Sequence, residues 1–227
     1  MTINTLLFDF DGTLQFGDKE ELVQRLNKIV ESLFMNIDKD EISSIADSTS
    51  DYKEMKKKMI DLHNFRSSSL INEGSFDEIN KKISGTLDHL FYLEDGARST
   101  LDYFKENGYK LGLVTTRGGN SLPRLLNETH KIARFFNVTI CRDDCKERKP
   151  NPTPILMALE RLNSEPSGSL YVGDNQIEDI GAAKNAKIIS VLKSYSNTLY
   201  FDGVPIPDYK IKRIIELPLL LIKINNV

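Results

Sequence analysis

The chain begins with an apolar segment that ends in two carboxylates, and this segment limits the folds that the chain can adopt. Residues 4–14 have the sequence Asn-Thr-Leu-Leu-Phe-Asp-Phe-Asp-Gly-Thr-Leu, in which Asp9 and Asp11 lie two positions apart and a glycine follows the second. An apolar run predicts a buried strand, and the glycine after it predicts a turn. Asp9 and Asp11 therefore leave the strand at its carboxyl end. Ligands bind at this edge of an open α/β sheet, so both acids are candidates for chemistry.

The rest of the chain divides into a helical segment and a segment in which strands and helices alternate. Between Lys19 and about Tyr92, apolar residues recur every three or four positions, which predicts amphipathic helices from Lys19 on and at 41–47, 52–65 and 76–92. After Gly96, strands are expected at 110–115, 137–141, 169–173, 187–192 and 209–211, and helices at 97–106, 120–129, 153–163, 177–186 and 217–222. Such alternation is typical of a parallel sheet covered by helices.

We therefore expect an α/β fold, a Rossmann-like parallel sheet flanked by helices, with an inserted helical domain. Residues 1–15 and 94–227 are expected to form the α/β core domain, and residues 16–93 the inserted domain. The first strand belongs with the later ones, because a strand alone cannot satisfy its backbone groups.

Composition excludes several classes of function. The chain has 227 residues, 40% of them hydrophobic and 28% charged, which is ordinary for a globular protein. Its net charge of -3 offers no basic footprint for nucleic acid. The apolar run 217–222 contains a proline and is too short to span a bilayer, and no export signal is visible, so we expect a cytoplasmic protein without a membrane partner. Cys141 and Cys145 lack a nearby histidine that would complete a zinc site, and we expect reduced thiols.

Three polar residues lie at the ends of later strands or in the loops beside them. Thr115 ends the strand that starts at Lys110, and Asp174 follows the strand 169–173. Lys149 comes just before a predicted helix. The carboxyl ends of parallel strands share one edge, so we expect these groups to meet there with the two acids of the first strand. This grouping argues against a turn that only caps that strand.

The combined groups suit phosphoryl transfer. The transition state of this reaction spreads negative charge over oxygens and is stabilised by hydroxyls, backbone amides, cations and a metal. A carboxylate nucleophile is already ionised near neutral pH, but an anionic phosphate repels it, and Mg²⁺ offsets that repulsion. Asp9, Asp11 and Asp174 offer the oxygen ligands that this hard ion prefers, and the lack of a Cys/His cluster argues against zinc.

These residues resemble the four motifs of the haloacid dehalogenase-like hydrolase superfamily. The matching segments are Asp9-Phe10-Asp11-Gly12-Thr13, Thr115 after an apolar strand, Lys149-Pro150 before a helix, and Val172-Gly173-Asp174 followed by Asp179. The resemblance spans nearly the whole chain. The helical insert is similar to the small α-helical cap type of this superfamily, and the segments 149–152 and 173–175 most resemble its phosphoglycolate phosphatase-like branch.

The resemblance implies a role for each motif residue. Asp9 is then the nucleophile that forms an aspartyl-phosphate, and Asp11 is the general acid of the first step and the general base of the second. The phosphoryl oxygens are then held by the hydroxyl group of Thr115 and the ammonium group of Lys149. Backbone amides near Gly12 and Thr116 add further hydrogen bonds.

The resemblance also implies the metal ligands. Mg²⁺ is then bound by Asp9, by the main-chain carbonyl of Asp11 and by Asp174, with a further carboxylate in the outer shell. Many relatives have that carboxylate four residues after the motif aspartate, where this chain has Glu178. Asp179 lies five residues on and matches their helix start better, so we favour Asp179 and keep Glu178 open.

The expected activity is a magnesium-dependent phosphatase of a small phosphorylated metabolite, such as a phosphoglycolate-like phosphomonoester. A phosphosugar mutase, a pyrophosphatase and a non-catalytic binding protein on the same fold stay open, as does the choice between monomer and homodimer. A carbon–halogen hydrolase is disfavoured, because such relatives lack the second aspartate. A phosphonate hydrolase also stays open; it would need a Schiff-base lysine in the cap, for which the candidates are Lys53, Lys56, Lys57 and Lys58.

The insert contains a cluster of basic residues. Lys53, Lys56, Lys57 and Lys58 are expected on a solvated helix face. Arg66, which precedes three serines, is a candidate for the contact with an anionic substrate.

Overall fold

The computed structural model describes residues 2–17, 19–47, 52–68, 70–75, 78, 91–118, 122–194 and 203–226. The chain divides into two compact units. The α/β unit comprises residues 1–16 and 92–227, and the helical unit comprises residues 17–91.

The α/β unit is built on a six-stranded sheet with the order β5-β4-β1-β6-β7-β8, in which every pair of neighbours is parallel. Its strands are β1 (Thr5–Phe8), β4 (Lys110–Val114), β5 (Val138–Ile140), β6 (Ser169–Gly173), β7 (Ile189–Lys193) and β8 (Tyr209–Ile211). All four residues of β1 are buried, as expected for a central strand covered on both faces. The predicted Rossmann-like α/β fold is confirmed.

Strand register decides which residues meet at the carboxyl edge of the sheet. Phe8, the last residue of β1, lies opposite Leu113 of β4 and Val172 of β6. The residues that follow these strands therefore leave the sheet side by side, and among them are Asp9 and Asp174.

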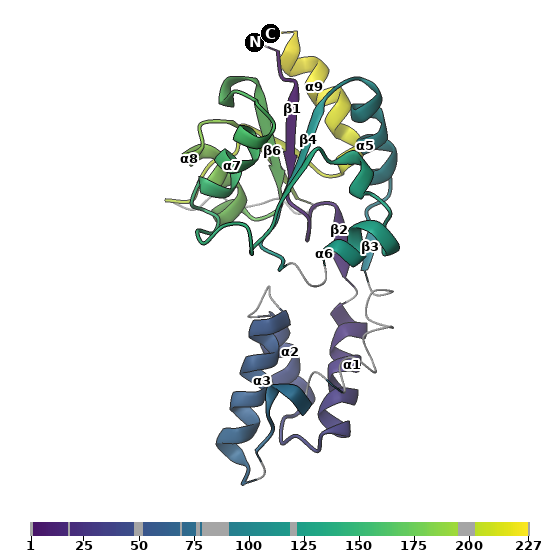
Figure 1. Ribbon diagram of the computed structural model, residues 1–227, viewed down its shortest axis with the longest axis vertical. Coiled ribbons are helices and arrows are strands. Elements are labelled where there is room, and N and C mark those ends of the chain that lie inside the picture. Colours follow the sequence, from purple (N-terminus) through teal and green to yellow (C-terminus); the bar gives the residue numbers. More distant parts are fainter. Residues whose placement is uncertain are drawn as a thin grey trace. The chain divides into compact units, whose positions relative to one another are not determined.

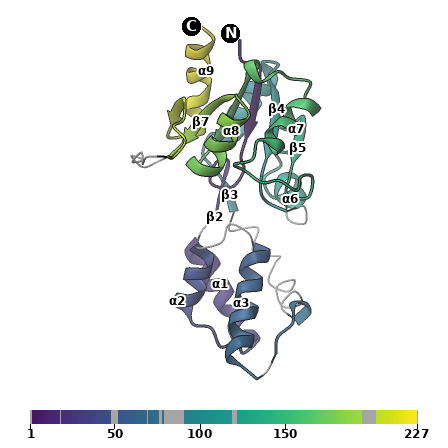
Figure 2. The same cartoon turned by 90° about the vertical axis from the view of Figure 1, so that its left-hand side faces the viewer.

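Helices cover both faces of this sheet, as Figures 1 and 2 show. On one face lie α5 (Ala97–Glu106) and α9 (Leu217–Asn225), and on the other lie α7 (Thr153–Arg161) and α8 (Gly181–Asn185). A short helix, α6 (Leu122–Arg124), continues into a wider helical turn, Leu125–Thr129, and a similar turn, Gln176–Ile180, precedes α8. Both wider turns overlap helices expected from the sequence, and the second begins one residue earlier than expected.

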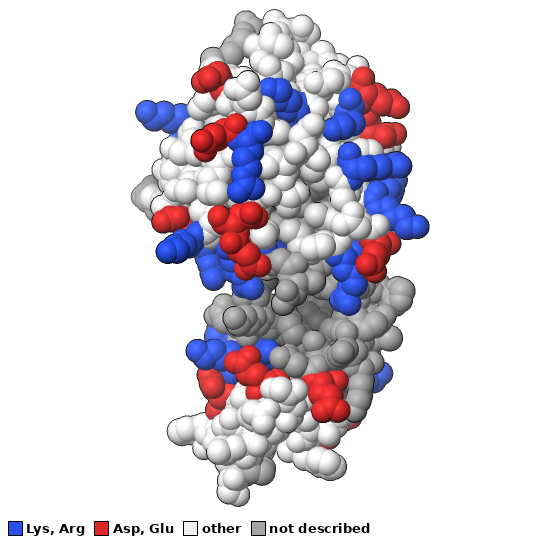
Figure 3. Space-filling model, viewed as in Figure 1, with Lys and Arg blue, Asp and Glu red and all other residues white. Residues whose placement is uncertain are grey.

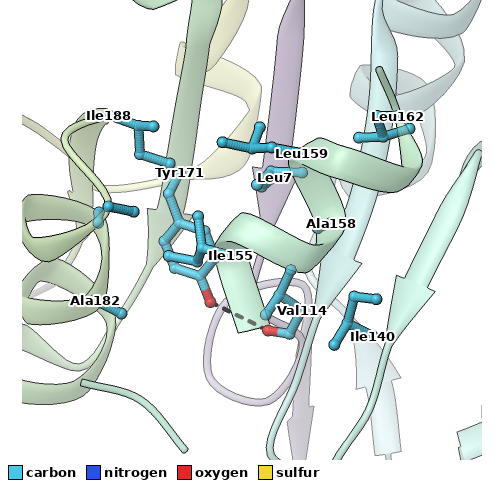
Figure 4. Packing of buried hydrophobic residues seen from close by; sticks show 12 residues of the cluster. Leu7, Val114, Ile140, Ile155, Ala158, Leu159, Leu162, Tyr171, Ala182 and Ile188 are labelled. Atoms are coloured by element: carbon cyan, nitrogen blue, oxygen red, sulfur yellow. Dashed lines mark hydrogen bonds between the residues drawn. The ribbon is translucent and has the colours of Figure 1, made fainter. Parts of the chain in front are cut away.

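Apolar side chains fill the space between the sheet and the α7–α8 layer. Figure 4 shows this cluster, whose members include Leu7, Val114, Ile155, Leu159 and Tyr171. Within it, the Tyr171 hydroxyl points to the carbonyl oxygen of Val114 at 3.1 Å, so the polar end of this buried ring has a hydrogen-bond partner.

The surface of the α/β unit is mixed in charge. On the face seen in Figure 3, Lys and Arg side chains lie beside Asp and Glu side chains. Among the residues that the structure describes, none of the helices has the length and apolar character required to cross a membrane.

The helical unit has an apolar core of its own. Its helices include α1 (Lys19–Ser32), α2 (Lys39–Asp47) and α3 (Tyr52–Arg66), and buried apolar residues from all three pack together, among them Leu26, Ile29, Ile42 and Met59. One prediction for this unit needs correction, because Lys56 is buried rather than solvated, with an ion pair of 3.1 Å to Glu73. Arg66 forms an ion pair with Glu41 at 2.7 Å, and its contact with an anionic substrate stays a prediction.

A small two-stranded sheet formed by β2 (Gln15–Gly17) and β3 (Phe91–Leu93) was not expected from the sequence. The prediction of a helix over 76–92 is wrong at its end, where β3 begins, and most of that range lies outside the described residues. Strands of three residues are too short to show a period of two, so the sequence offered no pattern for them.

Candidate active site

The acidic residues of the first motif leave β1 at the carboxyl edge of the sheet. The backbone N–H of Asp9 donates to the Val172 carbonyl at 2.9 Å, which continues the pairing of β1 with β6 for one more residue. Asp9 is buried. Its side chain is therefore held by the sheet itself, in a fixed place beside the ends of the neighbouring strands.

Lys149 lies at the centre of the site, although it is 140 positions from Asp9 in sequence. Its ammonium group donates to Asp9 Oδ1 at 2.7 Å, to Asp179 Oδ1 at 2.5 Å and to the Tyr171 hydroxyl at 3.0 Å. The Lys149 side chain is only 3% exposed. A buried ammonium group needs such partners, because removing a charge from water without compensation is strongly unfavourable.

The charged groups in this cluster shift each other's pKa values. Burial raises the pKa of Asp9 well above its usual value, with Lys149 opposing the shift and Asp179 and Asp174 adding to it. Burial alone lowers the pKa of Lys149, but Asp9, Tyr171 and Asp179 outweigh it and raise the pKa well above its usual value. Lys149 is therefore a permanent cation here, and an additional positive charge would favour the ionised form of Asp9.

Three carboxylates form an acidic cluster. Oxygens of Asp9, Asp174 and Asp179 all lie within 4.8 Å of one another, and Glu178 is not part of the group. Partial burial of Asp174, together with the nearby Asp179, raises the pKa of Asp174 to about 6. Three close carboxylates repel each other, and a divalent cation bound by their oxygens relieves this repulsion.

The turn after the first strand brings its backbone against the acidic cluster. Gly12 has φ of +78°, and a Cβ atom at this position would lie 2.2 Å from Asp174 Oδ2. Only glycine fits, because a side chain would both strain the backbone and collide with the carboxylate. The adjacent Thr13 hydroxyl donates to Asp174 Oδ1 at 3.2 Å. The turn therefore fixes the position of Asp174 from the side of the first motif.

Asp11 lies outside the acidic cluster and is bound by other partners. Arg117 donates to it through Nε at 2.9 Å and through Nη2 at 2.5 Å, and Gln15 Nε2 donates to Asp11 Oδ1 at 2.7 Å. The Asp11 side chain remains 41% exposed. Its carboxylate is thus held in place while one side stays accessible to a substrate.

Thr115 and Thr116 follow β4 at the same edge. Thr115 is buried, its N–H donates to the Ile140 carbonyl at 2.9 Å, and its hydroxyl oxygen accepts from the Arg117 N–H at 3.1 Å. Thr116 is half-buried beside it. These contacts shape the loop after β4.

The sequence pattern assigned no role to Tyr171, Gln15 or Arg117, nor to His130, whose Nε2 lies 2.6 Å from Gln15 Oε1. None of the four carried a local signal that would point to Asp11 or Lys149. Tyr171 stands in a strand and resembles any core aromatic, and a single Gln or His in a chain of this length indicates nothing by its spacing.

The two cysteines lie elsewhere in the loop after β5. Cys141 donates to Asp144 at 3.0 Å and Cys145 to Glu147 at 3.6 Å, and both are half-buried and outside any disulfide. Burial raises the pKa of both thiols. A raised pKa disfavours the reactive thiolate.

Comparison with known proteins identifies the family of the chain. The family model described as haloacid dehalogenase-like hydrolase matches residues 6–193. The pyrophosphatase PpaX of Bacillus mycoides (strain KBAB4) is 30% identical over 240 residues, which cover 100% of each chain.

Two solved structures extend the comparison. A HAD phosphatase from Thermococcus onnurineus is 27% identical, with a TM-score of 0.72 over 96% of this chain and 98% of that one. A predicted phosphoglycolate phosphatase from Haemophilus somnus 129pt shares the fold, with 20% identity and a TM-score of 0.73 over 97% of this chain and 98% of that one. The chain is therefore an enzyme that belongs to the haloacid dehalogenase-like hydrolase family.

Proposed function

We propose that the protein is a magnesium-dependent phosphatase that hydrolyses a small phosphorylated metabolite through an aspartyl-phosphate intermediate. The observation that carries the proposal is the position of Lys149, whose ammonium group bridges Asp9 and Asp179 at the edge where Asp174 also lies. A buried carboxylate beside a fixed cation is a nucleophile prepared to meet an anionic phosphoryl group.

In the first step, an Asp9 oxygen forms a bond to phosphorus while the bond from phosphorus to the leaving oxygen breaks. Asp11 gives its proton to that oxygen. In the second step, Asp11 takes a proton from water, the water oxygen binds phosphorus, and Asp9 leaves as a carboxylate. Both steps need stabilisation of the phosphoryl oxygens, which we assign to the hydroxyl of Thr115, the ammonium group of Lys149 and the backbone amides near Gly12 and Thr116.

The donor set at the edge of the sheet fits Mg²⁺. The ligands that we propose are carboxylate oxygens of Asp9 and Asp174 and the main-chain carbonyl of Asp11, with Asp179 acting from the outer shell. All are hard oxygen donors, and magnesium binds through a few carboxylates together with substrate phosphate oxygens. When bound, the ion supplies charge neutralisation that lets an anionic nucleophile approach an anionic phosphate.

Hydrolysis of p-nitrophenyl phosphate tests this proposal. With Mg²⁺ present we expect turnover that EDTA abolishes and that Asp9→Asn lowers by at least about 1000-fold, since the nucleophile is lost. Asp102→Asn, which removes an exposed carboxylate on α5, is the matched control and should leave the rate unchanged. Full activity of Asp9→Asn would contradict the mechanism.

The covalent intermediate offers a second test. Acid quenching during turnover should leave a phosphoryl group on the peptide that contains Asp9, detectable by mass spectrometry. The same peptide from the Asp9→Asn variant should carry none. Phosphate release without any trapped phosphoryl group under rapid quench would argue for direct attack by water.

Inorganic pyrophosphate is a second candidate substrate. The identity of 30% to a pyrophosphatase along the full length of both chains favours it. Phosphate release should therefore be measured from pyrophosphate and from a panel of phosphomonoesters that includes phosphoglycolate. The compound with the highest kcat/KM identifies the substrate class, and conversion of a phosphosugar to its isomer without phosphate release would instead indicate a mutase.

A further inference from the structure

We infer that Gln15 and His130 are positioning residues that hold the Asp11 carboxylate in the orientation needed for proton transfer to the leaving group. The inference rests on the proposed function, because it concerns the general acid of that reaction. It assigns to these two residues a role that the motif pattern does not supply.

The contacts around Asp11 form a chain. Gln15 Nε2 lies 2.7 Å from Asp11 Oδ1, and the other end of the Gln15 amide, Oε1, lies 2.6 Å from His130 Nε2. Gln15 and His130 are 115 positions apart in sequence, so only the folded chain brings them together.

The chemistry of these atoms fixes the direction of each hydrogen bond. A carboxylate oxygen paired with Arg117 accepts hydrogen bonds, so the Gln15 amide must turn its nitrogen toward Asp11. The Gln15 carbonyl oxygen then faces His130 and accepts too, so His130 Nε2 carries the hydrogen. With its hydrogen on Nε2, His130 therefore stabilises the amide orientation in which the Gln15 nitrogen faces Asp11.

Burial makes this chain rigid at one end and accessible at the other. Gln15 is 0% exposed and His130 is 4% exposed, whereas the Asp11 side chain is 41% exposed. His130 is itself anchored, since its N–H donates to the Leu125 carbonyl at 2.8 Å and its ring packs edge-on against Phe10 with centroids 6.1 Å apart. A partly exposed carboxylate on a short side chain is thus fixed from its buried side.

Gln15 donates its hydrogen bond to the side chain of Asp11, which is not a member of the acidic cluster. Changes to the side chains of Gln15 or His130 should therefore leave Asp9 and the carboxylate ligands of the metal in place and act mainly on proton transfer by the Asp11 side chain. A proton from Asp11 matters most when the leaving oxygen is strongly basic, and matters little when the leaving group is a stable anion. Misplacing Asp11 should make the reaction more sensitive to the basicity of the leaving group.

The test compares three esters of increasing leaving-group basicity: p-nitrophenyl phosphate, phenyl phosphate and β-glycerol phosphate. The quantity to measure is kcat/KM with Mg²⁺ present, because it reports the first phosphoryl transfer and not the later hydrolysis of the intermediate. In Gln15→Leu and His130→Leu, kcat/KM should fall by about 10- to 100-fold for β-glycerol phosphate. For p-nitrophenyl phosphate it should fall by less than about threefold.

Two conservative variants separate positioning from packing. His130→Gln retains an N–H donor for Gln15 and should restore most of the activity on β-glycerol phosphate. Gln15→Glu keeps the acceptor for His130 but turns a carboxylate toward Asp11, and should be impaired at least as much as Gln15→Leu. Ser169→Ala, a buried polar change at the amino end of β6, is the control for general destabilisation and should keep the wild-type pattern. Circular dichroism and thermal unfolding show which variants fold.

The outcomes distinguish this inference from the proposed function. Equal loss on all three esters in the folded variants, or no loss on any of them, would overturn the inference and leave the phosphatase proposal standing. Failure of the wild-type protein to hydrolyse any ester with Mg²⁺ present would overturn both. A selective loss on β-glycerol phosphate that His130→Gln repairs would establish the positioning role.

Discussion

At the scale of single residues, the site depends on a buried cation between carboxylates. Lys149 compensates Asp9 and Asp179 with hydrogen bonds of 2.7 and 2.5 Å, and without it the two buried acids would lack this neutralising charge. The same cation is available to phosphoryl oxygens once a substrate enters. One side chain therefore contributes to both stability and chemistry.

Replacing Lys149 with methionine should impair both. Breaking a buried ion pair by removing one partner leaves uncompensated charge, so the free energy of unfolding should fall by about 3 kcal/mol. The value of kcat for p-nitrophenyl phosphate should fall by at least about 100-fold. Urea unfolding and steady-state kinetics measure the two effects. Lys146→Met, an exposed lysine in the same loop, should change neither.

Asp174 offers a prediction about pH. Its pKa in the folded protein, about 6, is above the usual 3.8, so the folded state binds this proton more tightly than the unfolded state does. The metal-free protein should therefore gain stability from this group as pH falls from about 7 toward 4, and the ionised carboxylate should be destabilising above about pH 7.

Asp174→Asn should accordingly raise the thermal midpoint of EDTA-treated protein at about pH 7.5. We expect about 2–4 °C, or roughly 1 kcal/mol once solvent screening of this accessible carboxylate is taken into account. The gain should shrink near pH 5, where Asp174 in the wild-type protein is largely protonated. A variant that melts below the wild type at both pH values would contradict the assignment. Asp102→Asn serves as the exposed control.

At the scale of elements, the turn between β1 and β2 sets the distance between the first motif and Asp174. Gly12 adopts a positive φ at the point where a Cβ would meet the Asp174 carboxylate. Gly108 has nearly the same φ, +77°, but nothing lies within 4 Å of where its Cβ would be. Gly12 and Gly108 thus share a backbone conformation but differ in their surroundings.

Gly12→Ala and Gly108→Ala form a matched pair. Both should lower the free energy of unfolding by about 1–2 kcal/mol, because a residue with a Cβ is strained at this φ. Only Gly12→Ala should also lower kcat and weaken the response to Mg²⁺, by about tenfold or more, since Asp174 must move. Kinetics at graded Mg²⁺ concentrations separate the two variants. Equal activity in both would show that the approach of the turn to Asp174 is unimportant.

Elements differ in how far the sequence could specify them. Central strands such as β1 and β6 were predicted within a few residues, because continuous apolar runs bounded by glycine are a strong local signal. The short pair β2 and β3 was missed, and Lys56 was assigned to solvent although it is buried. Three-residue strands and a lysine whose stem packs in a core depend on neighbours that are distant in sequence.

At the scale of the whole molecule, the chain consists of two compact units with separate apolar cores. The residues of the proposed metal site all belong to the α/β unit. A ligand that binds one unit stabilises that unit, and unfolding of such a chain need not follow a two-state model.

Binding of Mg²⁺ should therefore have a localised effect. At about 100 times its dissociation constant, it should stabilise the α/β unit by about 2.7 kcal/mol. Amide hydrogen exchange should slow in the segments 9–13 and 174–179 of the α/β unit, with little change in α1 and α3 of the helical unit. In the Asp174→Asn variant the protection should be lost. Uniform protection of both units, or none in either, would contradict a site confined to the edge of the sheet.

The sequence by itself determined the fold class and the residues at the carboxyl ends of the central strands, among them Asp9, Thr115 and Asp174. These follow from hydrophobic periodicity and from glycine after a strand, which are local properties of the chain. Only the tertiary structure decided that Gln15, Arg117 and His130 converge on Asp11, and that Tyr171 and Asp179 share the ammonium group of Lys149. The reason is physical: each of these contacts joins side chains from separate elements, so it exists only once the packing of the sheet and its loops has fixed their separation.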